Sequence, residues 1–282
     1  MRERSPRNVP FARCHIFKIA EADIFNRPWL RRILFAVCAA GFAIWAYSRL
    51  AETGFEYEWQ WNRAWRQFGR LTADGFVPGP LCDGLLFTTG VTFAGALVSV
   101  VCGLVSAIFT LSPWPLCARF ARLYTGLFRN TPLLIQLFFV YFLISPLFNL
   151  DAFWSAVLTL GAFEGAYLCE LFRASLLAVS RTQWEASLSL GFSLSQTLFL
   201  VILPQAFRLA LPAFSNQLIA LLKDTSLVSA IALADLTMRA QAVVAETFLA
   251  FEVWLIAALF YLMLSLFISL PFLMLEKYWK WR

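Results

Sequence analysis

The chain has 282 residues, of which 60% are hydrophobic and 14% are charged, and its mean hydropathy is +0.70. Soluble globular domains are roughly 45–50% apolar and about 25% charged, so this composition is typical of a membrane protein and argues against a soluble domain. The net charge of +6 does not indicate a nucleic-acid partner, because no Lys- and Arg-rich face with interleaved aromatic residues occurs outside the N-terminal tail.

The cysteines and the histidine give no sign of a metal site or a catalytic centre. The six cysteines are scattered, mostly within apolar runs, and show no CxxC or Cys/His ligand spacing. The single histidine, His15, lies in the basic tail formed by residues 1–32. We therefore expect no bound metal, no catalytic residue and no disulfide framework.

The apolar runs predict an all-α fold, a polytopic membrane helical bundle with about six spans. A spanning helix needs about 20 predominantly apolar residues, and fewer where flanking residues reach the interface. Six segments approach that requirement: residues 33–48, 85–111, 133–148, 152–177, 212–232 and 248–275. The fifth segment is the weakest, because prolines and charges interrupt it. We interpret the first as an uncleaved extra span and not as a signal peptide, because the tail before it is too long.

The distribution of positive charge predicts that both termini are cytoplasmic. In that topology most of the 23 Lys and Arg residues lie on the inner side, as they do in most membrane proteins. Residues 49–80 are then external. Their stretch "EYEWQWNRAWRQ" is rich in Trp and Tyr, which favours a position at the level of the lipid headgroups. We interpret it as an interfacial segment.

A polar island, "QWEASLSLGFSLSQTLFLVILPQ" (183–205), lies in the inner loop at residues 178–211. Thr182 and Glu185 have the spacing of a helix capping box. Gly191 permits a tight turn after two turns of helix, and Pro204 is expected to end the apolar stretch that follows. The pattern predicts a short helix-turn-helix on the inner face, although an ordinary amphipathic loop would also fit it.

This island resembles the EAA loop of the permeases of ATP-binding-cassette importers, whose usual pattern is Glu-Ala-Ala, three residues, Gly, nine residues, Ile, one residue and Leu-Pro. The matching residues are Glu185, Ala186, Ser187, Gly191, Leu203 and Pro204. Ser187 replaces the second Ala of the pattern and Val201 replaces the Ile. Three further stretches, "LFRNTPLLIQLFFVYF" (127–142), "AYLCELFRASL" (166–176) and "LLKDTSLVSAIALADLTMRAQ" (221–241), resemble the polar amino-acid branch of that family. The resemblance covers residues 81–278.

The resemblance implies a type I importer permease domain of five spans at residues 81–278, preceded by one extra N-terminal span at 33–48. It implies that the matching residues of the island form a coupling helix on a separate ATPase. It further implies two ATPase subunits, a second permease subunit, identical or related, and an external amino-acid-binding protein. The location is then the bacterial inner membrane. The substrate class is polar amino acids, with a preference for cationic or glutamine-like ones.

The sequence also indicates that nucleotide binds to another subunit. The phosphate-binding pattern GxxxxGK[ST] does not occur, so ATP and Mg²⁺ are expected on the partner ATPase and no cofactor is expected on this chain. We expect a transport subunit and not an enzyme. The alternative is a secondary transporter driven by an ion gradient, in which Glu164 and Asp224 would carry protons. That alternative leaves the EAA-like spacing unexplained.

Charged residues near the middle of two predicted spans mark a candidate substrate path. Glu164 lies near the centre of 152–177, where a carboxylate costs at least a few kcal/mol unless it faces a cavity or a partner. Lys223 and Asp224 lie near the centre of 212–232, where a locally opened helix could bind a solute. The candidate residues are Glu164, Tyr167, Lys223, Asp224, Thr225 and Ser226. A purely structural pair between Glu164 and Lys223 is the alternative.

Small residues at four-residue spacing predict a helix-packing face. They let two helix backbones approach closely, which is how many membrane helices associate. The expected packing residues are Gly95, Ser99 and Gly103 in the second span and Gly161 and Gly165 in the fourth. In the fourth span, Glu170 and Arg173 are three residues apart and are expected to form an ion pair within the helix.

Overall fold

The computed structural model describes residues 28–52, 57–73 and 75–280. Helix α2 (Pro28–Glu52) belongs to a first unit that ends at Trp59, and the second unit comprises Gln60–Arg282. The stretch Arg32–Arg49 within α2 is long and apolar enough to cross a membrane, as predicted for the extra span. Most of the predicted basic tail (1–27) lies outside the described residues.

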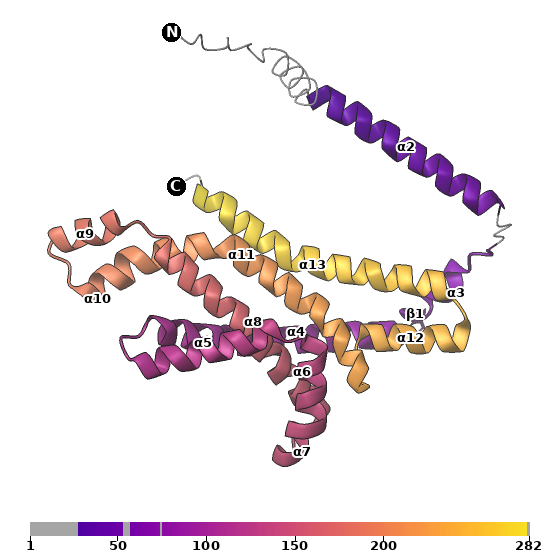
Figure 1. Cartoon of the computed structure of the whole chain (residues 1–282). Helices are drawn as coiled ribbons and strands as arrows, with labels where there is room; N and C mark the ends of the chain where they lie inside the picture. Colours follow the sequence, from indigo (N-terminus) through magenta and orange to yellow (C-terminus); the bar gives the residue numbers. More distant parts are fainter. Residues whose placement is uncertain (1–27, 53–56, 74, 281–282) are drawn as a thin grey trace, which may run out of the picture. The chain divides into compact units, whose positions relative to one another are not determined.

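Four long helices form the frame of the second unit (Figure 1). They are α4 (Pro80–Leu111), α8 (Ala152–Leu177), a continuous helical stretch from Leu194 to Ile231, and α13 (Ala250–Lys280). Among the described residues, five helices including α2 meet the length and hydropathy of a span, and the number rises to six if a bent pair is counted as one span. The predicted all-α bundle of about six spans is confirmed.

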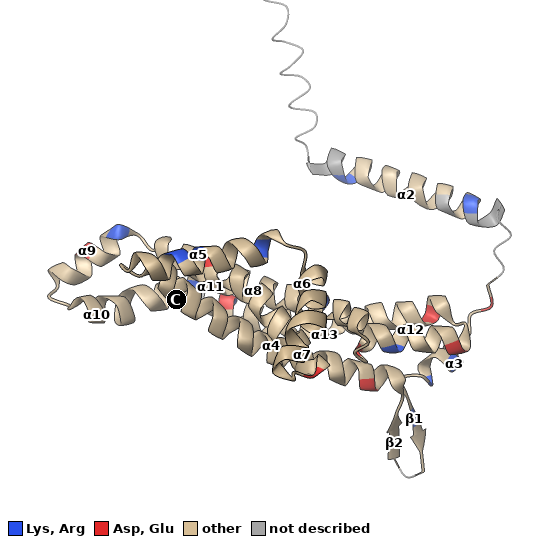
Figure 2. Cartoon of the chain, turned by 60° about the horizontal axis from the view of Figure 1, so that its bottom comes forward, with Lys and Arg blue, Asp and Glu red and all other residues tan. Residues whose placement is uncertain are grey.

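The bent pair consists of α5 (Pro115–Asn130) and the stretch Leu133–Phe148, which meet at an angle of 108°. That stretch contains α6 (Leu133–Phe139), the π-helical η1 (Val140–Ile144) and α7 (Ser145–Phe148). In Figures 1 and 2, α5 runs beside α4 and α8, whereas α6 and α7 turn across them. The sequence predicted a span over 133–148 but not the amphipathic helix α5 before it.

The side chain of Gln136 holds this bend. Its amide nitrogen donates to the carbonyl of Phe128 (2.8 Å), and also to the hydroxyl (2.6 Å) and carbonyl (3.0 Å) oxygens of Thr131. Carbonyls at the end of α5 have no partner within their own helix, so a side-chain donor from α6 satisfies them. Below the bend, Leu133 and Leu137 are buried against α8 and the Leu194–Ile231 stretch.

Close packing of α4 on α8 forms the centre of the bundle. A Cβ atom added to Gly103 would lie 2.7 Å from the Cβ of Leu168, and one added to Gly165 would lie 2.7 Å from the Cβ of Cys102. Gly161 faces Val98 at a similarly short separation, and Ser99 is buried in the same contact. The small residues of the two helices therefore face one another, which lets the backbones approach closely.

The helix that contains the fifth predicted span (212–232) starts well before residue 212. The helix begins at Leu194 with α10 (Leu194–Gln196) and continues through the π-helical η2 (Thr197–Ile202), α11 (Leu203–Asp224) and the 3-10 helix η3 (Thr225–Ile231). Pro204 was expected to end an apolar stretch, but the helix passes through it. Proline lacks an N–H and clashes with the carbonyl four residues before it, and the wider π-turn at Thr197–Ile202 accommodates both effects.

The end of the second unit opposite to α10 is formed by short elements (Figure 2). These are α3 (Trp61–Trp65), the antiparallel strands β1 (Gly69–Thr72) and β2 (Gly75–Pro78), and α12 (Leu236–Thr247). Asp235 caps α12 by accepting from the N–H groups of Met238 (2.8 Å) and Thr237 (3.2 Å). Burial raises the pKa of Asp235, and these two N–H donors act against that rise. The two strands were not predicted.

Replacing Gly103 by Ala should destabilise the α4–α8 contact. The added methyl would overlap the Cβ of Leu168, and overpacking of this kind costs about 1–3 kcal/mol. Gly90→Ala on the same helix is the matched control, because a Cβ there meets nothing within 4 Å. We expect thermal unfolding in mild detergent to show a lower Tm for Gly103→Ala and an unchanged or slightly higher one for Gly90→Ala. Equal Tm values would contradict the close packing.

Candidate functional site

Glu164 lies between α8 and α11, at the middle of α8. Only 1% of its surface is exposed, and the side-chain amide of Gln217 on α11 donates to its carboxyl oxygen Oε2. A carboxyl group buried in an apolar interior requires such a donor, because an unsatisfied polar atom there costs about 1–3 kcal/mol. The bond thus fixes α8 against α11 at this depth.

A second carboxyl group faces the first. Asp224, the last residue of α11, lies close enough to Glu164 for the two carboxyl groups to interact electrostatically. Neither carboxyl has an ion-pair partner among the described residues, whereas Glu170 pairs with Arg173 (2.7 Å), as predicted. Two adjacent carboxylates repel each other, so this pair favours a proton or a cation between them.

The other predicted path residues next to Asp224 in the chain have different surroundings. Lys223 is exposed and forms no ion pair with Glu164, so the alternative of a Glu164–Lys223 pair is not realised in the structure. The hydroxyl of Thr225 donates to the carbonyl of Leu222 (2.6 Å), and Ser226 follows in the first turn of η3. The helix tightens from α to 3-10 geometry directly after Asp224, so its hydrogen-bonding pattern changes at this position.

A basic pocket of about 250 Å³ lies next to the acid pair. It is lined by Arg122, Thr125, Gly126, Arg129 and Asn130 of α5 and by Tyr167 of α8. The guanidinium carbon of Arg129 lies 5.2 Å from the centre of the Tyr167 ring. Tyr167 follows Glu164 by one helical turn, which places their Cβ atoms about 5–6 Å apart. Tyr167 thus links the Arg129 guanidinium, which contacts its ring, to the Glu164 carboxyl, one helical turn away.

Helix α5, which carries most of this pocket, contacts α8 close to Glu164. The hydroxyl of Tyr124 donates to the carbonyl of Ala162 (2.5 Å), so α5 crosses α8 within one turn of Glu164. Arg129 is nevertheless exposed on the surface of the single chain. A charged side chain at mid-membrane does not face lipid tails without a large cost, so Arg129 is expected to face a water-filled cavity or another subunit.

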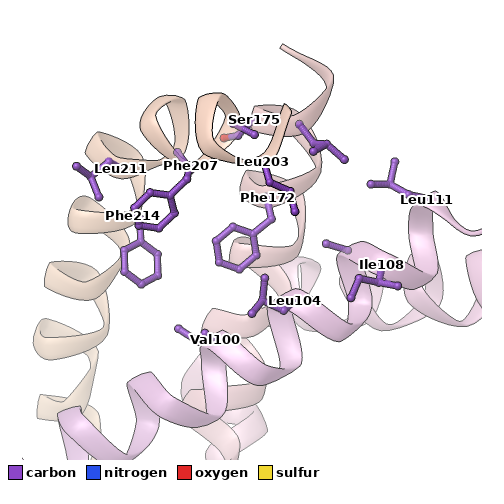
Figure 3. A pocket seen from close by; sticks show the side chains of 14 residues that line it. Val100, Leu104, Ile108, Leu111, Phe172, Ser175, Leu203, Phe207, Leu211 and Phe214 are labelled. Atoms are coloured by element: carbon purple, nitrogen blue, oxygen red, sulfur yellow. The ribbon is translucent and has the colours of Figure 1, made fainter. Parts of the chain in front are cut away.

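The larger apolar pocket does not have the chemistry of a polar-solute site. It measures about 360 Å³ and lies between α4, α8 and α11 (Figure 3). The side chains of Phe172, Phe207 and Phe214 meet there, and Ser175 is its one hydroxyl-bearing residue. An amino acid placed in it would lose its hydration without gaining hydrogen bonds, which is strongly unfavourable.

The polar island folds into an elbow, which we define as residues 181–196, at one end of the bundle (Figure 1). Helix α9 (Arg181–Ser189) ends before Gly191, whose φ of +86° lies in the left-handed region that favours glycine. After the turn, Ser193 and Gln196 form a capping box at the start of α10. The predicted capping box at Thr182 and Glu185 is wrong, because the N-cap of α9 is Ser180 and no side chain caps it.

The elbow is fixed on one side and exposed on the other. Buried Ser187 donates to the hydroxyl of Thr197 (3.1 Å), which joins α9 to η2. Glu185 and Ala186 point to solvent, and Glu185 pairs only with exposed Arg181. Apolar side chains stand exposed around the turn: Leu188 (42%), Leu190 (78%), Phe192 (38%) and Leu194 (69%). Exposed apolar residues grouped at an end of a protein mark an interaction surface. Leu203 and Pro204 are also exposed, on the helix beyond the elbow.

Residues 99–279 match the family model described as "Binding-protein-dependent transport system inner membrane component". The chain belongs to this family. It is a multi-pass inner-membrane permease, the membrane component of an ATP-binding-cassette importer and not a secondary transporter driven by an ion gradient.

Relatives of this permease carry amino-acid transport names. The glutamine transport system permease protein GlnP of Escherichia coli (strain K12) is 35% identical over 204 residues, which is 71% of this chain and 93% of GlnP. The L-cystine transport system permease protein TcyB of Bacillus subtilis (strain 168) is 41% identical over 163 residues, 57% of this chain and 69% of TcyB. The arginine transport system permease protein ArtQ of B. subtilis is 35% identical over 191 residues, 67% of this chain and 87% of ArtQ.

Solved structures give the same fold. A chain from the crystal structure of an amino acid ABC transporter with histidines aligns with a TM-score of 0.65 and 34% identity, covering 70% of this permease and 93% of that chain. A chain of the inward-facing MetNI methionine ABC transporter aligns with a TM-score of 0.61 at 18% identity, which shows a shared fold.

Three residues of the site did not stand out in the sequence. Gln217 is a single amide within an apolar helix, and its role depends on the contact between α8 and α11. Arg129 and Asn130 lie at the end of α5, and Arg129 contacts Tyr167, one helical turn from Glu164. The helix break of 108° between α5 and α6 comes directly after these residues, and composition alone does not reveal it.

Replacing Gln217 by Leu should destabilise the protein through Glu164. The substitution removes the amide donor and leaves a buried carboxyl unsatisfied, at a cost of about 1–3 kcal/mol. In a Glu164→Leu background the same substitution should cost much less, because the group that needs the donor is gone. Unfolding of the four variants in detergent measures this coupling. Strictly additive effects would contradict the Glu164–Gln217 interaction.

Proposed function

We propose that this permease moves polar amino acids and that the acid pair Glu164–Asp224 binds the positive group of the substrate. Substrates with a cationic side chain, or glutamine-like ones, are favoured. The names of the relatives support the substrate class, because glutamine, arginine and cystine are polar amino acids. The observation that best supports the proposal is that the neighbouring carboxyl groups of Glu164 and Asp224, near the middle of predicted spans, have no ion-pair partner among the described residues.

An ammonium or guanidinium group matches the acid pair in charge and in hydrogen bonding. Carboxylates accept charge-assisted bonds from such donors, and these bonds are about twice as strong as neutral ones. Entry of the cation would also remove the repulsion between Glu164 and Asp224. Gln217 would then keep the Glu164 carboxyl oriented, while Thr225 and Ser226 supply hydroxyl groups where the helix changes to 3-10 geometry. Lys223, next to Asp224 in the sequence, is exposed and forms no ion pair with Glu164.

The basic pocket suits the other end of an amino acid. Arg129 and Asn130 offer donors to a carboxylate, and a guanidinium binds a carboxylate in bidentate geometry. Tyr167 lies between this pocket and Glu164 and packs its ring against the Arg129 guanidinium. A zwitterion bound across Tyr167 would therefore place each charge next to its opposite.

Neutralising the acid pair should impair transport. We expect Glu164→Gln and Asp224→Asn to lower kcat/KM for uptake at least about tenfold, a loss of about 1.4 kcal/mol of binding to the substrate cation. The assay is uptake of radiolabelled glutamine, arginine and cystine by the assembled importer in proteoliposomes. Asp83→Asn is the control, since Asp83 is an exposed acid in the first turn of α4. Unchanged kinetics for all three amino acids would refute the assignment.

We further propose that the elbow binds the ATPase. Glu185, Ala186, Ser187 and Gly191 would form the coupling segment, and Leu203 and Pro204 would continue it along the helix. The exposed apolar side chains around Gly191 supply area that an ATPase groove can cover, while Glu185 supplies a charged contact at its side. ATP and Mg²⁺ would bind to two ATPase subunits and not to this chain.

Reversing the charge at Glu185 should uncouple the importer. In Glu185→Arg the contact with the ATPase becomes repulsive, and we expect ATP-driven uptake to fall below a tenth of the normal rate. Arg181→Ala is the matched control, because it removes the Arg181–Glu185 ion pair and keeps the Glu185 charge. That exposed pair is worth little by itself, so the control should transport normally. Full uptake by Glu185→Arg would disprove the coupling role.

The remaining parts of the assembly follow from the same proposal. A second permease subunit, identical or related, would close the path on the side where Arg129 is exposed. An external amino-acid-binding protein would deliver the substrate at the end opposite to the elbow. The C-terminus would be cytoplasmic, because the elbow and the C-terminal end of α13 lie at the same end of the bundle (Figure 1). The basic residues of the tail before α2 favour the same side for the N-terminus.

A further inference from the structure

The hairpin β1–β2 exposes several apolar side chains. Leu71 pairs with Phe76 across the strands, so both side chains point to the same face, and they are 88% and 51% exposed. Arg70 and Thr72 neighbour Leu71 in the strand and therefore point to the opposite face. Exposure of these apolar side chains to water is unfavourable, and burying them would be stabilising. Val77, which pairs with Arg70, is 51% exposed on that opposite face, and the ring of Phe76 lies 6.1 Å from that of Phe68. Leu71 is therefore the most exposed apolar side chain of the hairpin.

Hydrogen bonds fix the hairpin at the start of two spanning helices. The N–H of Gly79 donates to the carbonyl of Phe68 (2.8 Å), and the N–H of Leu81 in α4 donates to Gln67 (3.1 Å). The N–H of Gln60 donates to the buried carboxyl of Glu252 in α13 (2.7 Å). Spanning helices leave the hydrocarbon near their ends, so these ties place the hairpin at the membrane surface opposite to the elbow.

The packing of α3 and of the turn that follows it also favours a position at the membrane surface. The ring of Phe68 lies 4.8 Å from that of Phe260 in α13, and the ring of Trp65 contacts Phe260 edge-on at 6.4 Å. Trp61 and Trp65 also stay partly exposed, and Arg66 is exposed beside them. Trp rings together with Arg are typical of the headgroup region, where the ring meets the acyl boundary and the guanidinium meets phosphate.

We propose that the hairpin is a lipid anchor, whose Leu71–Phe76 face inserts at the acyl boundary while Arg70 and Arg66 bind headgroup phosphates. Figure 2 shows the hairpin extending sideways from the bundle, across the direction of α13. It therefore extends along the membrane plane, over the lipid around the bundle. A soluble binding protein would approach along the membrane normal, so the observations favour lipid. Burial of the two side chains in the interface would hold the outer ends of α4 and α13 at a constant depth.

The test compares the two hairpin faces in the full-length chain in lipid nanodiscs. In a variant whose six native cysteines are replaced by serine, single cysteines at Leu71→Cys and Thr72→Cys carry a bimane label. Phospholipids with a nitroxide near the glycerol quench a label that reaches the acyl boundary. We expect the label at position 71 to be quenched at least threefold more than the label at position 72. Both sites are exposed, so labelling does not depend on unfolding.

Equal and weak quenching at both positions would overturn the proposal. So would a label at position 71 that lipid does not quench but that the binding protein shields when added, because that result would assign the hairpin to protein docking. Replacing the anionic lipids of the nanodisc by zwitterionic ones tests the role of Arg70 and Arg66. The proposal expects less quenching at position 71 in the zwitterionic discs, and an Arg70→Gln, Arg66→Gln variant should lose that dependence on lipid charge.

Discussion

The structure depends on two neighbouring carboxyl groups, of which Glu164 is buried and Asp224 is half-buried. Gln217 of α11 donates to Glu164, and no cation pairs with either carboxyl group among the described residues. Hydrocarbon penalises such an arrangement by several kcal/mol, so packing elsewhere must stabilise it. The close contact of α4 with α8 provides this stability. A fold that keeps an uncompensated acid pair at this depth is suited to binding a cation there and releasing it.

A single helical stretch joins the acid pair to the elbow. It runs for 38 residues from Leu194, next to the turn at Gly191, through Asp224 to Ile231. Thr197, at its inner end, is hydrogen-bonded to Ser187 of α9, and Asp224 lies beyond its middle. If α9 binds the ATPase as proposed, a force on it would reach the acid pair through this stretch without an intervening loop, because a helix is stiff along its axis. The π-turn at Thr197–Ile202 and Pro204 is the place where such a helix can bend.

Much of the architecture was predictable, because long apolar runs determine which segments cross a membrane. The boundaries of α8 and the existence of six apolar segments followed directly from the sequence. The helical residues before 212 were missed because serines around Leu194 and the proline at 204 are typical of loops, and a π-turn that accommodates a proline leaves no compositional signal. The partners of Glu164 were missed for another reason. Gln217 and Asp224 reach it only through the packing of two helices, which no local pattern specifies.

The central claim is that the acid pair binds the positive group of the transported amino acid. The most direct measurement is a structure of the assembled importer, with its ATPase, determined in the presence of a transported amino acid. The account predicts the ammonium or guanidinium nitrogen of the substrate about 3 Å from the carboxyl oxygens of Glu164 or Asp224. A substrate bound elsewhere in the path, with the Glu164–Gln217 bond and the Asp224 contact unchanged, would contradict it.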